Sequence, residues 1–197
     1  MPEILIVPTG TANIASVMAA FRRLGANPRV CERPDEIAAA SHVMLPGVGA
    51  FGASMARLAQ HGLDAALLER IAADRPTIAI CVGHQLLFEA SEESLGVRGL
   101  GVVPGAIGRF SEDVRVPQFG WNHVHAGEDN RLLESGYAYF ANSYRALQAP
   151  GWAVAHASHG GRFVAAMERG NVIGCQFHPE LSGAYGAALL SRFLELA

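Results

Sequence analysis

The sequence lacks the hallmarks of secreted, membrane-spanning and nucleic-acid-binding proteins. Its N-terminal segment, MPEILIVPTG, includes an acidic residue and no basic one, so it does not resemble a signal peptide. No apolar run approaches the roughly 18 residues that span a bilayer. The 15 Lys and Arg residues against 18 Asp and Glu residues form no basic block, which argues against nucleic acid and membranes as partners.

Cysteine is also scarce. The three cysteines, Cys31, Cys81 and Cys175, are odd in number and irregularly spaced, so we expect free thiols in a cytoplasmic protein. No Cys-x-x-Cys pair occurs, and no group of His, Cys, Asp and Glu shows the spacing of a zinc or calcium site, so we expect no metal. Because half of the residues are hydrophobic, the chain is not disordered, and 197 residues suit a single domain over 1–197.

The first half alternates strand and helix patterns, which is typical of a parallel sheet covered by helices on both faces. Strands are expected at Ile4–Val7, around Val30, at His42–Leu45 and at Thr77–Ile80. Helices are expected at Ile14–Leu24, Asp35–Ala40, Ser54–Gln60, Leu63–Ala73 and Gly83–Ala90. The second half predicts a meander of strands at Tyr137–Ala141, Trp152–Ala157, Phe163–Glu168 and Val172–Phe177, then a helix at Gly183–Leu196. The fold is therefore predicted to be α/β, with a mostly parallel central sheet, helices on both faces and an antiparallel β extension.

Cys81 follows directly after the predicted strand Thr77–Ile80 and precedes a predicted helix. This order resembles a nucleophile elbow, in which a sharp turn lifts the side chain out of the sheet. The helix N-terminus would favour the thiolate, and the N–H of Val82 would stabilise an oxyanion. A buried structural cysteine is the alternative, and it is our interpretation of Cys31 and Cys175, which lack this context.

A second group of reactive residues is His178-Pro179-Glu180, which follows another apolar strand. Glu180 would fix the tautomer of the His178 imidazole, and a Cys–His–Glu set suffices for acyl transfer through a thioester. A histidine and a glutamate in a surface loop are the alternative. The sequence by itself does not show that Cys81 and His178 meet.

Three glycines, Gly47, Gly49 and Gly52, form a Gly-x-Gly-x-x-Gly pattern. This pattern follows the third predicted strand, and Asp74, at the spacing of a ribose-binding acid, precedes a strand instead of ending one. We therefore reject a dinucleotide site. A glycine-rich strand end can instead approach a substrate closely and present N–H groups to an oxyanion, with a plain tight turn as the alternative.

The motifs PGVG, CVGHQ and FHPE occur in the order found in class I, triad-type glutamine amidotransferases, and the chain resembles that family. The segments LPGVGAFGASM, LLFEASEES, GLGVVPGAIGRF, VPQFGWN, YFANSY and QFHPELSG are similar to the glutaminase subunits of imidazole glycerol phosphate synthases. The resemblance covers nearly the whole chain, and GWN and SEES distinguish these subunits from other glutaminases.

The resemblance implies roles for individual residues. Cys81 would be the nucleophile, His178 the general base and acid, and Glu180 the orienting carboxylate. The oxyanion hole would involve Val48, Gly49 and Val82, and the residues at the glutamine pocket would be Gln85, Glu93, Ser143 and Tyr144. The PGVG strand would need a peptide flip before its donor points inward, which would couple activity to a partner. No metal or organic cofactor is implied.

The resemblance also implies a reaction. L-Glutamine would be hydrolysed through a Cys81 thioester, and ammonia would pass to a (β/α)8 barrel cyclase subunit in a heterodimer. The products would be imidazole glycerol phosphate and an aminoimidazole carboxamide ribotide, in histidine biosynthesis. Three alternatives stay open: a class I glutaminase of another pathway, such as pyridoxal phosphate or tryptophan synthesis, a free-standing cysteine hydrolase, and a catalytically silent interaction subunit.

Four positions depart from the family pattern. Ala79 replaces the usual Gly two residues before the cysteine and would tighten the elbow. His84 stands where Met is usual. Gln118 and Asn142 each replace a common His, and these two changes bear on the partner interface. The triad residues themselves are intact.

Overall fold

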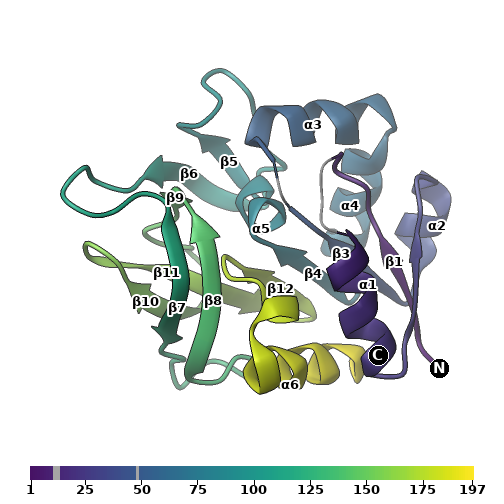
Figure 1. Cartoon of the computed structure of the whole chain (residues 1–197). Helices are drawn as coiled ribbons and strands as arrows, with labels where there is room; N and C mark the ends of the chain where they lie inside the picture. Colours follow the sequence, from purple (N-terminus) through teal and green to yellow (C-terminus); the bar gives the residue numbers. More distant parts are fainter. Residues whose placement is uncertain (11–13, 48) are drawn as a thin grey trace.

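The computed structural model describes residues 1–10, 14–47 and 49–197, with a seven-stranded sheet at its centre (Figure 1). Its strands lie in the order β10 (Ala153–Ser158), β11 (Arg162–Arg169), β12 (Val172–Cys175), β4 (Thr77–Ile80), β3 (His42–Leu45), β1 (Glu3–Ile6) and β2 (Asn27–Val30). The five strands from β12 to β2 are parallel, and β11 and β10 extend the sheet in antiparallel fashion. The predicted fold class is confirmed.

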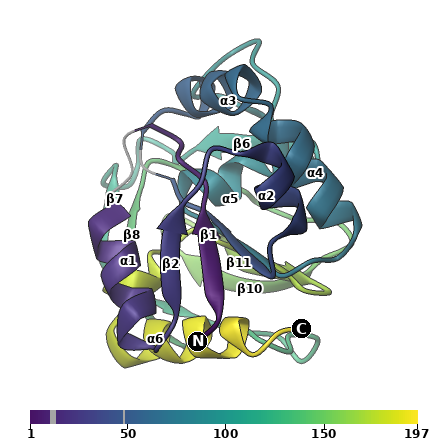
Figure 2. The same cartoon turned by 90° about the vertical axis from the view of Figure 1, so that its right-hand side faces the viewer.

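Helices cover both faces of this sheet. Figure 2 shows α1 (Ile14–Arg23) and α6 (Gly183–Leu194) on one face, with α2 (Pro34–Ala39) and α4 (Leu63–Ala72) on the other. The third helix, α3 (Phe51–Gln60), packs against α4. Every residue of β3 and β4 is buried, as expected for strands enclosed between two helical layers. Within the described ranges, no helix is long and apolar enough to cross a membrane.

The second half differs from the predicted meander. The strand β8 (Gly136–Asn142) pairs with β7 (Gln118–Val124) and not with β10, so the two form a separate hairpin. Three further strands, which the sequence did not predict, form another small sheet: β5 (Phe88–Ser91), β6 (Val103–Arg109) and β9 (Tyr144–Arg145).

The predicted helix at Gly83–Ala90 is wrong in its second half. The helix α5 spans only Val82–Leu86, and the chain then continues as β5. The cause is tertiary: the returning segment bonds to the backbone of this region, with the Leu100 N–H donating to the Leu86 carbonyl at 2.8 Å. Such pairing with a distant segment overrides local helix preference.

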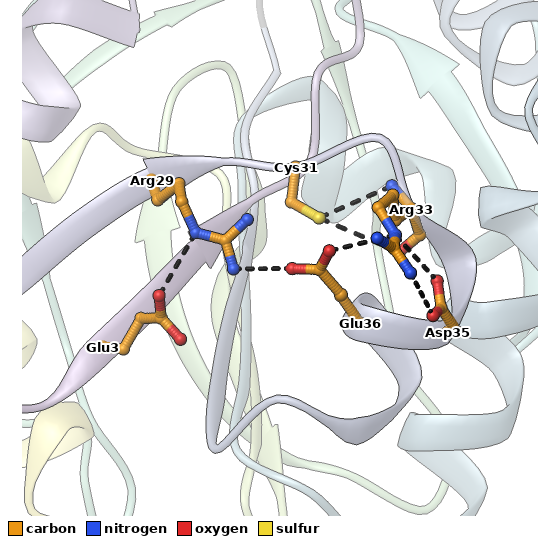
Figure 3. A network of polar contacts seen from close by, with 6 residues as sticks. All are labelled: Glu3, Arg29, Cys31, Arg33, Asp35 and Glu36. Carbon is orange, nitrogen blue, oxygen red and sulfur yellow. Dashed lines mark hydrogen bonds and ion pairs between the residues drawn. The ribbon is translucent and has the colours of Figure 1, made fainter.

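An ion-pair network ties the N-terminal strands to α2 (Figure 3). Arg29 on β2 pairs with Glu3 on β1 and with Glu36 on α2. These pairs are exposed, so each contributes little to stability. Beside them, the buried sulfur of Cys31 accepts the N–H of Arg33. Cys31 thus lies in a local structural contact at the end of β2, three strands along the sheet from β4, which Cys81 follows.

Candidate active site

Cys81 and His178 follow two strands that are neighbours in the sheet. β4 and β12 pair in parallel, with Ile80 opposite Cys175, and the Cys81 N–H donates to the Cys175 carbonyl at 2.7 Å. Parallel strands end at the same edge of a sheet, which is where ligands bind in such folds. One parallel pairing therefore closes the long separation in sequence between the two residues.

The backbone at Cys81 makes a sharp turn. Its φ of 54° and ψ of −110° lie in a region that is costly for any residue except glycine, as is common at functional sites. The helix α5 starts at once, and the Gln85 N–H donates to the Cys81 carbonyl at 3.1 Å. The geometry is that of a nucleophile elbow, while the nucleophilic role itself stays a prediction.

Two glycines allow the chain to pack closely around this turn. A Cβ atom on Gly83 would lie 2.2 Å from the Leu45 carbonyl oxygen. A Cβ atom on Gly47 would lie 2.1 Å from the Gly83 nitrogen. The segment after β3 and the start of α5 are therefore in backbone contact, and only glycine fits at either position.

His178 is bonded on both sides. Its Nδ1 lies 2.8 Å from Oε1 of Glu180, and both side chains are largely buried. Burial lowers the pKa of His178, but hydrogen bonds with Cys81 and Glu180 outweigh it and raise the pKa to about 10. The structure thus brings together Cys81, His178 and Glu180. The arrangement favours a protonated imidazole held between the sulfur and the carboxylate.

Ser182 fixes the loop that carries His178, and the sequence did not suggest this role. The buried Ser182 hydroxyl donates to the His178 carbonyl at 2.6 Å and accepts the Tyr139 N–H at 2.9 Å. The His178 N–H in turn donates to the Tyr139 carbonyl at 2.9 Å. This loop is therefore tied to β8. The only signal for Ser182 was its presence in the QFHPELSG segment.

The predicted oxyanion donors are only partly in position. The N–H of Val82 donates to the Gly47 carbonyl at 3.4 Å, so this donor is engaged by the protein itself. Gly49 is exposed and has a φ of 114°, which favours glycine. Val48 lies outside the described residues. For the Val82 N–H to hold a substrate oxygen, the Gly47 carbonyl must turn away.

Two buried glutamines form a hydrogen-bond network that reaches the Cys81 sulfur through Gln176. Nε2 of Gln85 donates to Oε1 of Gln176 at 2.9 Å and to the Tyr144 carbonyl at 3.3 Å. Nε2 of Gln176 lies 3.8 Å from Sγ of Cys81. Gln85 and Tyr144 were predicted for the substrate pocket, and both lie in this network. Gln176 belongs to the QFHPELSG motif, but its contact with the sulfur was not predicted from the sequence.

The other two predicted pocket residues bond elsewhere. The Glu93 carboxylate accepts the Phe51 N–H at 2.6 Å, at the N-terminus of α3, where a negative charge is favourable. The Ser143 carbonyl accepts the Phe110 N–H at 3.1 Å, at the end of β6. Their assignment to the glutamine pocket stays a prediction.

The departures from the family pattern also have defined positions. Ala79 is fully buried in β4 between Leu45 and Gly174. His84 is fully buried, and neither of its ring nitrogens has a hydrogen-bond partner among the described residues. Gln118 and Asn142 lie directly opposite each other across the β7–β8 pair. The last two changes therefore occupy one place in the structure and not two.

Comparisons with known proteins agree with this geometry. Residues 5–196 match the family model described as glutamine amidotransferase class-I. The chain is 41% identical to imidazole glycerol phosphate synthase subunit HisH of Methanothermobacter thermautotrophicus, covering 98% of each chain. It is 39% identical to the same subunit of Escherichia coli K12, covering 98% of this chain and 100% of that protein.

A longer relative and the solved structures complete the comparison. The chain is 40% identical to imidazole glycerol phosphate synthase hisHF, chloroplastic, of Arabidopsis thaliana, of which it spans only 34%. A crystal structure of a glutamine amidotransferase superposes with a TM-score of 0.78 at 19% identity, covering 97% of each chain. PurLQS from Thermotoga maritima gives 0.75 at 18% identity, covering 98% of this chain and 97% of that one. These structural likenesses establish the fold alone.

Proposed function

Because this chain belongs to the class I glutamine amidotransferase family, we propose that it hydrolyses L-glutamine at Cys81 as the glutaminase subunit of an imidazole glycerol phosphate synthase. The observation that carries the proposal is the convergence of Cys81, His178 and Glu180 at one edge of the central sheet. Full-length relatives named as the HisH subunit support the assignment to histidine biosynthesis.

The proposed reaction has two halves. The Cys81 thiolate attacks the side-chain carboxamide carbon of glutamine, and protonated His178 gives its proton to the leaving ammonia, which leaves a γ-glutamyl thioester. Water then attacks the thioester with His178 as general base. The C–S bond breaks, the electron pair returns to the sulfur, and glutamate is released. Glu180 holds the imidazole in position throughout.

The remaining predicted site residues are proposed to bind the glutamine substrate and to stabilise the oxyanion. Gln85, Glu93, Ser143 and Tyr144 are proposed to line the glutamine pocket, and Val82 with the Val48–Gly49 segment to hold the oxyanion. Loss of one oxyanion donor typically costs about 3–4 kcal/mol of barrier. Because the Gly47 carbonyl accepts the Val82 N–H in this structure, the oxyanion hole has to be assembled before the chain can turn over glutamine rapidly.

The proposed acceptor of the ammonia is a (β/α)8 barrel cyclase in a heterodimer. The name of the longer plant relative, hisHF, supports a second functional part beyond the region that this chain covers. An aromatic surface on the β7–β8 hairpin, formed by Phe119, Trp121 and Tyr137, is 59–68% exposed and offers a docking face. Tyr139, which contacts both Phe119 and Trp121, binds His178 through its backbone, so this face adjoins the triad.

A cytoplasmic location is part of the proposal. All three cysteines are free and buried, which suits a reducing compartment.

The test is glutamate release from L-glutamine by the purified chain, alone and with the cognate cyclase and its nucleotide ligand. We expect glutamate release to increase strongly with the liganded partner. We expect no glutamate release from Cys81→Ser. Strong release that ignores the partner would keep the cysteine chemistry but overturn the assignment to this synthase. Absence of release under both conditions would favour the silent interaction subunit.

A further inference from the structure

We propose that the side-chain amide of Gln176 donates a hydrogen bond to the Cys81 sulfur and thereby stabilises its thiolate. The inference rests on the proposed role of Cys81 as nucleophile. Gln176 directly follows β12, its side chain is fully buried, and its Nε2 lies 3.8 Å from Sγ. This distance is within hydrogen-bonding range for the large sulfur atom.

The orientation of the Gln176 amide is fixed by its neighbours. The Tyr144 carbonyl can only accept hydrogen bonds, so the amide nitrogen of Gln85 must face it. Nε2 of Gln85 also faces Gln176, which therefore turns its oxygen toward Gln85. The N–H group of Gln176 is left to face Cys81. Asn142 donates to the same Tyr144 carbonyl at 3.0 Å and so holds the far end of the chain of amides.

A neutral donor suits the reaction at this place. Cys81 is only 4% exposed, so water provides little solvation for a thiolate. His178 bonds to the sulfur, but it gives up its proton when ammonia leaves. The amide of Gln176 carries no titrating proton, so its N–H can keep its hydrogen bond to the Cys81 sulfur through both halves of the reaction. It stabilises the sulfur again when the C–S bond of the thioester breaks.

The experiment measures the rate of Cys81 alkylation by iodoacetamide against pH, with the modified peptide identified by mass spectrometry. Gln176→Met keeps the length of the side chain and removes its donor. We expect the midpoint of the rate profile to rise by about one pH unit, a tenfold change in thiolate population, with the alkaline plateau retained. Gln148→Met, on an exposed loop, is the matched control and leaves the midpoint unchanged.

A change of plateau without a change of midpoint would show a packing role and overturn the proposal. Should Gln176→Met not fold, the wild-type chain provides the test through its side-chain amide NMR signals. The Gln176 signal is expected to shift with the Cys81 titration, and an invariant signal would overturn the inference.

Because iodoacetamide does not resemble glutamine, the alkylation rate tests the inference without depending on glutaminase activity. The inference and the proposed function can therefore be contradicted separately. An unmoved midpoint in a chain that hydrolyses glutamine with its partner removes only the inference. A shifted midpoint in a chain without glutaminase activity removes only the proposed function.

Discussion

The N–H of Val82 donates to the carbonyl oxygen of Gly47, 3.4 Å away. Val82 directly follows the proposed nucleophile, so its N–H is one of the groups that would hold the negative oxygen of a tetrahedral intermediate. In the structure this group already has a partner. The resting chain therefore has the proposed triad residues together, while one proposed oxyanion donor is already occupied.

The first prediction is that the isolated chain is a poor glutaminase. Without the Val82 donor we expect glutamate release at least about 100-fold below that of the complex with liganded cyclase, since one oxyanion donor is worth about 10²–10³ in kcat. Steady-state glutamate release under the two conditions measures the ratio. Equal rates would show that the Gly47 carbonyl does not limit turnover.

A second prediction concerns Gly47 itself. In Gly47→Ala the new methyl group would lie 2.1 Å from the Gly83 nitrogen, so the loop after β3 has to move away from α5. We expect a loss of about 2 kcal/mol in the free energy of unfolding, measured in urea, and loss of partner-stimulated activity. The control is Gly127→Ala, whose methyl group would have its nearest neighbours at 3.7 Å or more. A stable and fully active Gly47→Ala chain would contradict the close packing.

A third prediction follows from His178. Its pKa is about 10 in the folded chain, against an ordinary value near 6.5. The contribution of this proton to stability is therefore complete below about pH 6.5 and is lost as the pH rises toward 10. Thiol, α-amino and phenol groups also titrate in this window, so the wild-type chain is compared with Glu180→Gln, which changes the environment of His178. We expect the free energy of unfolding to fall over this range, and to fall less in Glu180→Gln; identical slopes would refute the coupling of His178 to Glu180.

Local patterns were sufficient to predict the parallel strands β1 to β4, but not the parallel pairing of β12 with β4. The strands β3 and β4 match their predicted ranges because short apolar runs are bounded there by Gly and Pro. The helices between the parallel strands were predicted from the periodicity of their apolar residues. The strand β5 was missed because its partner β6 comes from later in the chain. Pairing of this kind leaves no mark on the local sequence.

In the candidate site, too, local features were predictable from the sequence and contacts between distant segments were not. The turn at Cys81 was predictable, since a thiol between a buried strand and a helix has few other geometries. That His178 meets Cys81 depends on the β4–β12 pairing, which the sequence alone did not establish. The contacts of Gln176 and Ser182 were missed because an interior amide or hydroxyl shows its partner only in three dimensions.

A fourth prediction tests the docking face. Trp121 is 59% exposed on the β7–β8 hairpin and rests edge-on against Tyr139. Trp121→Ala is expected to weaken binding of the cyclase by about 2 kcal/mol, roughly 30-fold in Kd, because exposed aromatic residues often dominate interfaces. Calorimetry measures the affinity. Leu68→Ala, on α4, is the control that leaves it unchanged, and an unaltered Kd in Trp121→Ala would place the interface elsewhere.

The last prediction concerns His84, which lies one helical turn beyond Cys81. Burial lowers the pKa of His84 to about 3, and within the part of the chain that the structure describes neither ring nitrogen has a hydrogen-bond partner. In the unfolded chain the His84 imidazole takes up a proton near pH 6.5, whereas in the folded chain it stays neutral. The free energy of unfolding therefore decreases as the pH falls below 6.5.

His84→Met removes this loss, and its side chain has no polar nitrogen to leave unpaired. We expect a gain of about 1 kcal/mol in the free energy of unfolding at pH 7 and about 2 kcal/mol more at pH 5. Urea unfolding at the two pH values measures both gains, with the more exposed His61→Met as control. A gain that is the same at both pH values would mean that His84 does not resist protonation. A loss at pH 7 would mean that the imidazole packs against Gly174 and Phe88 better than a thioether can.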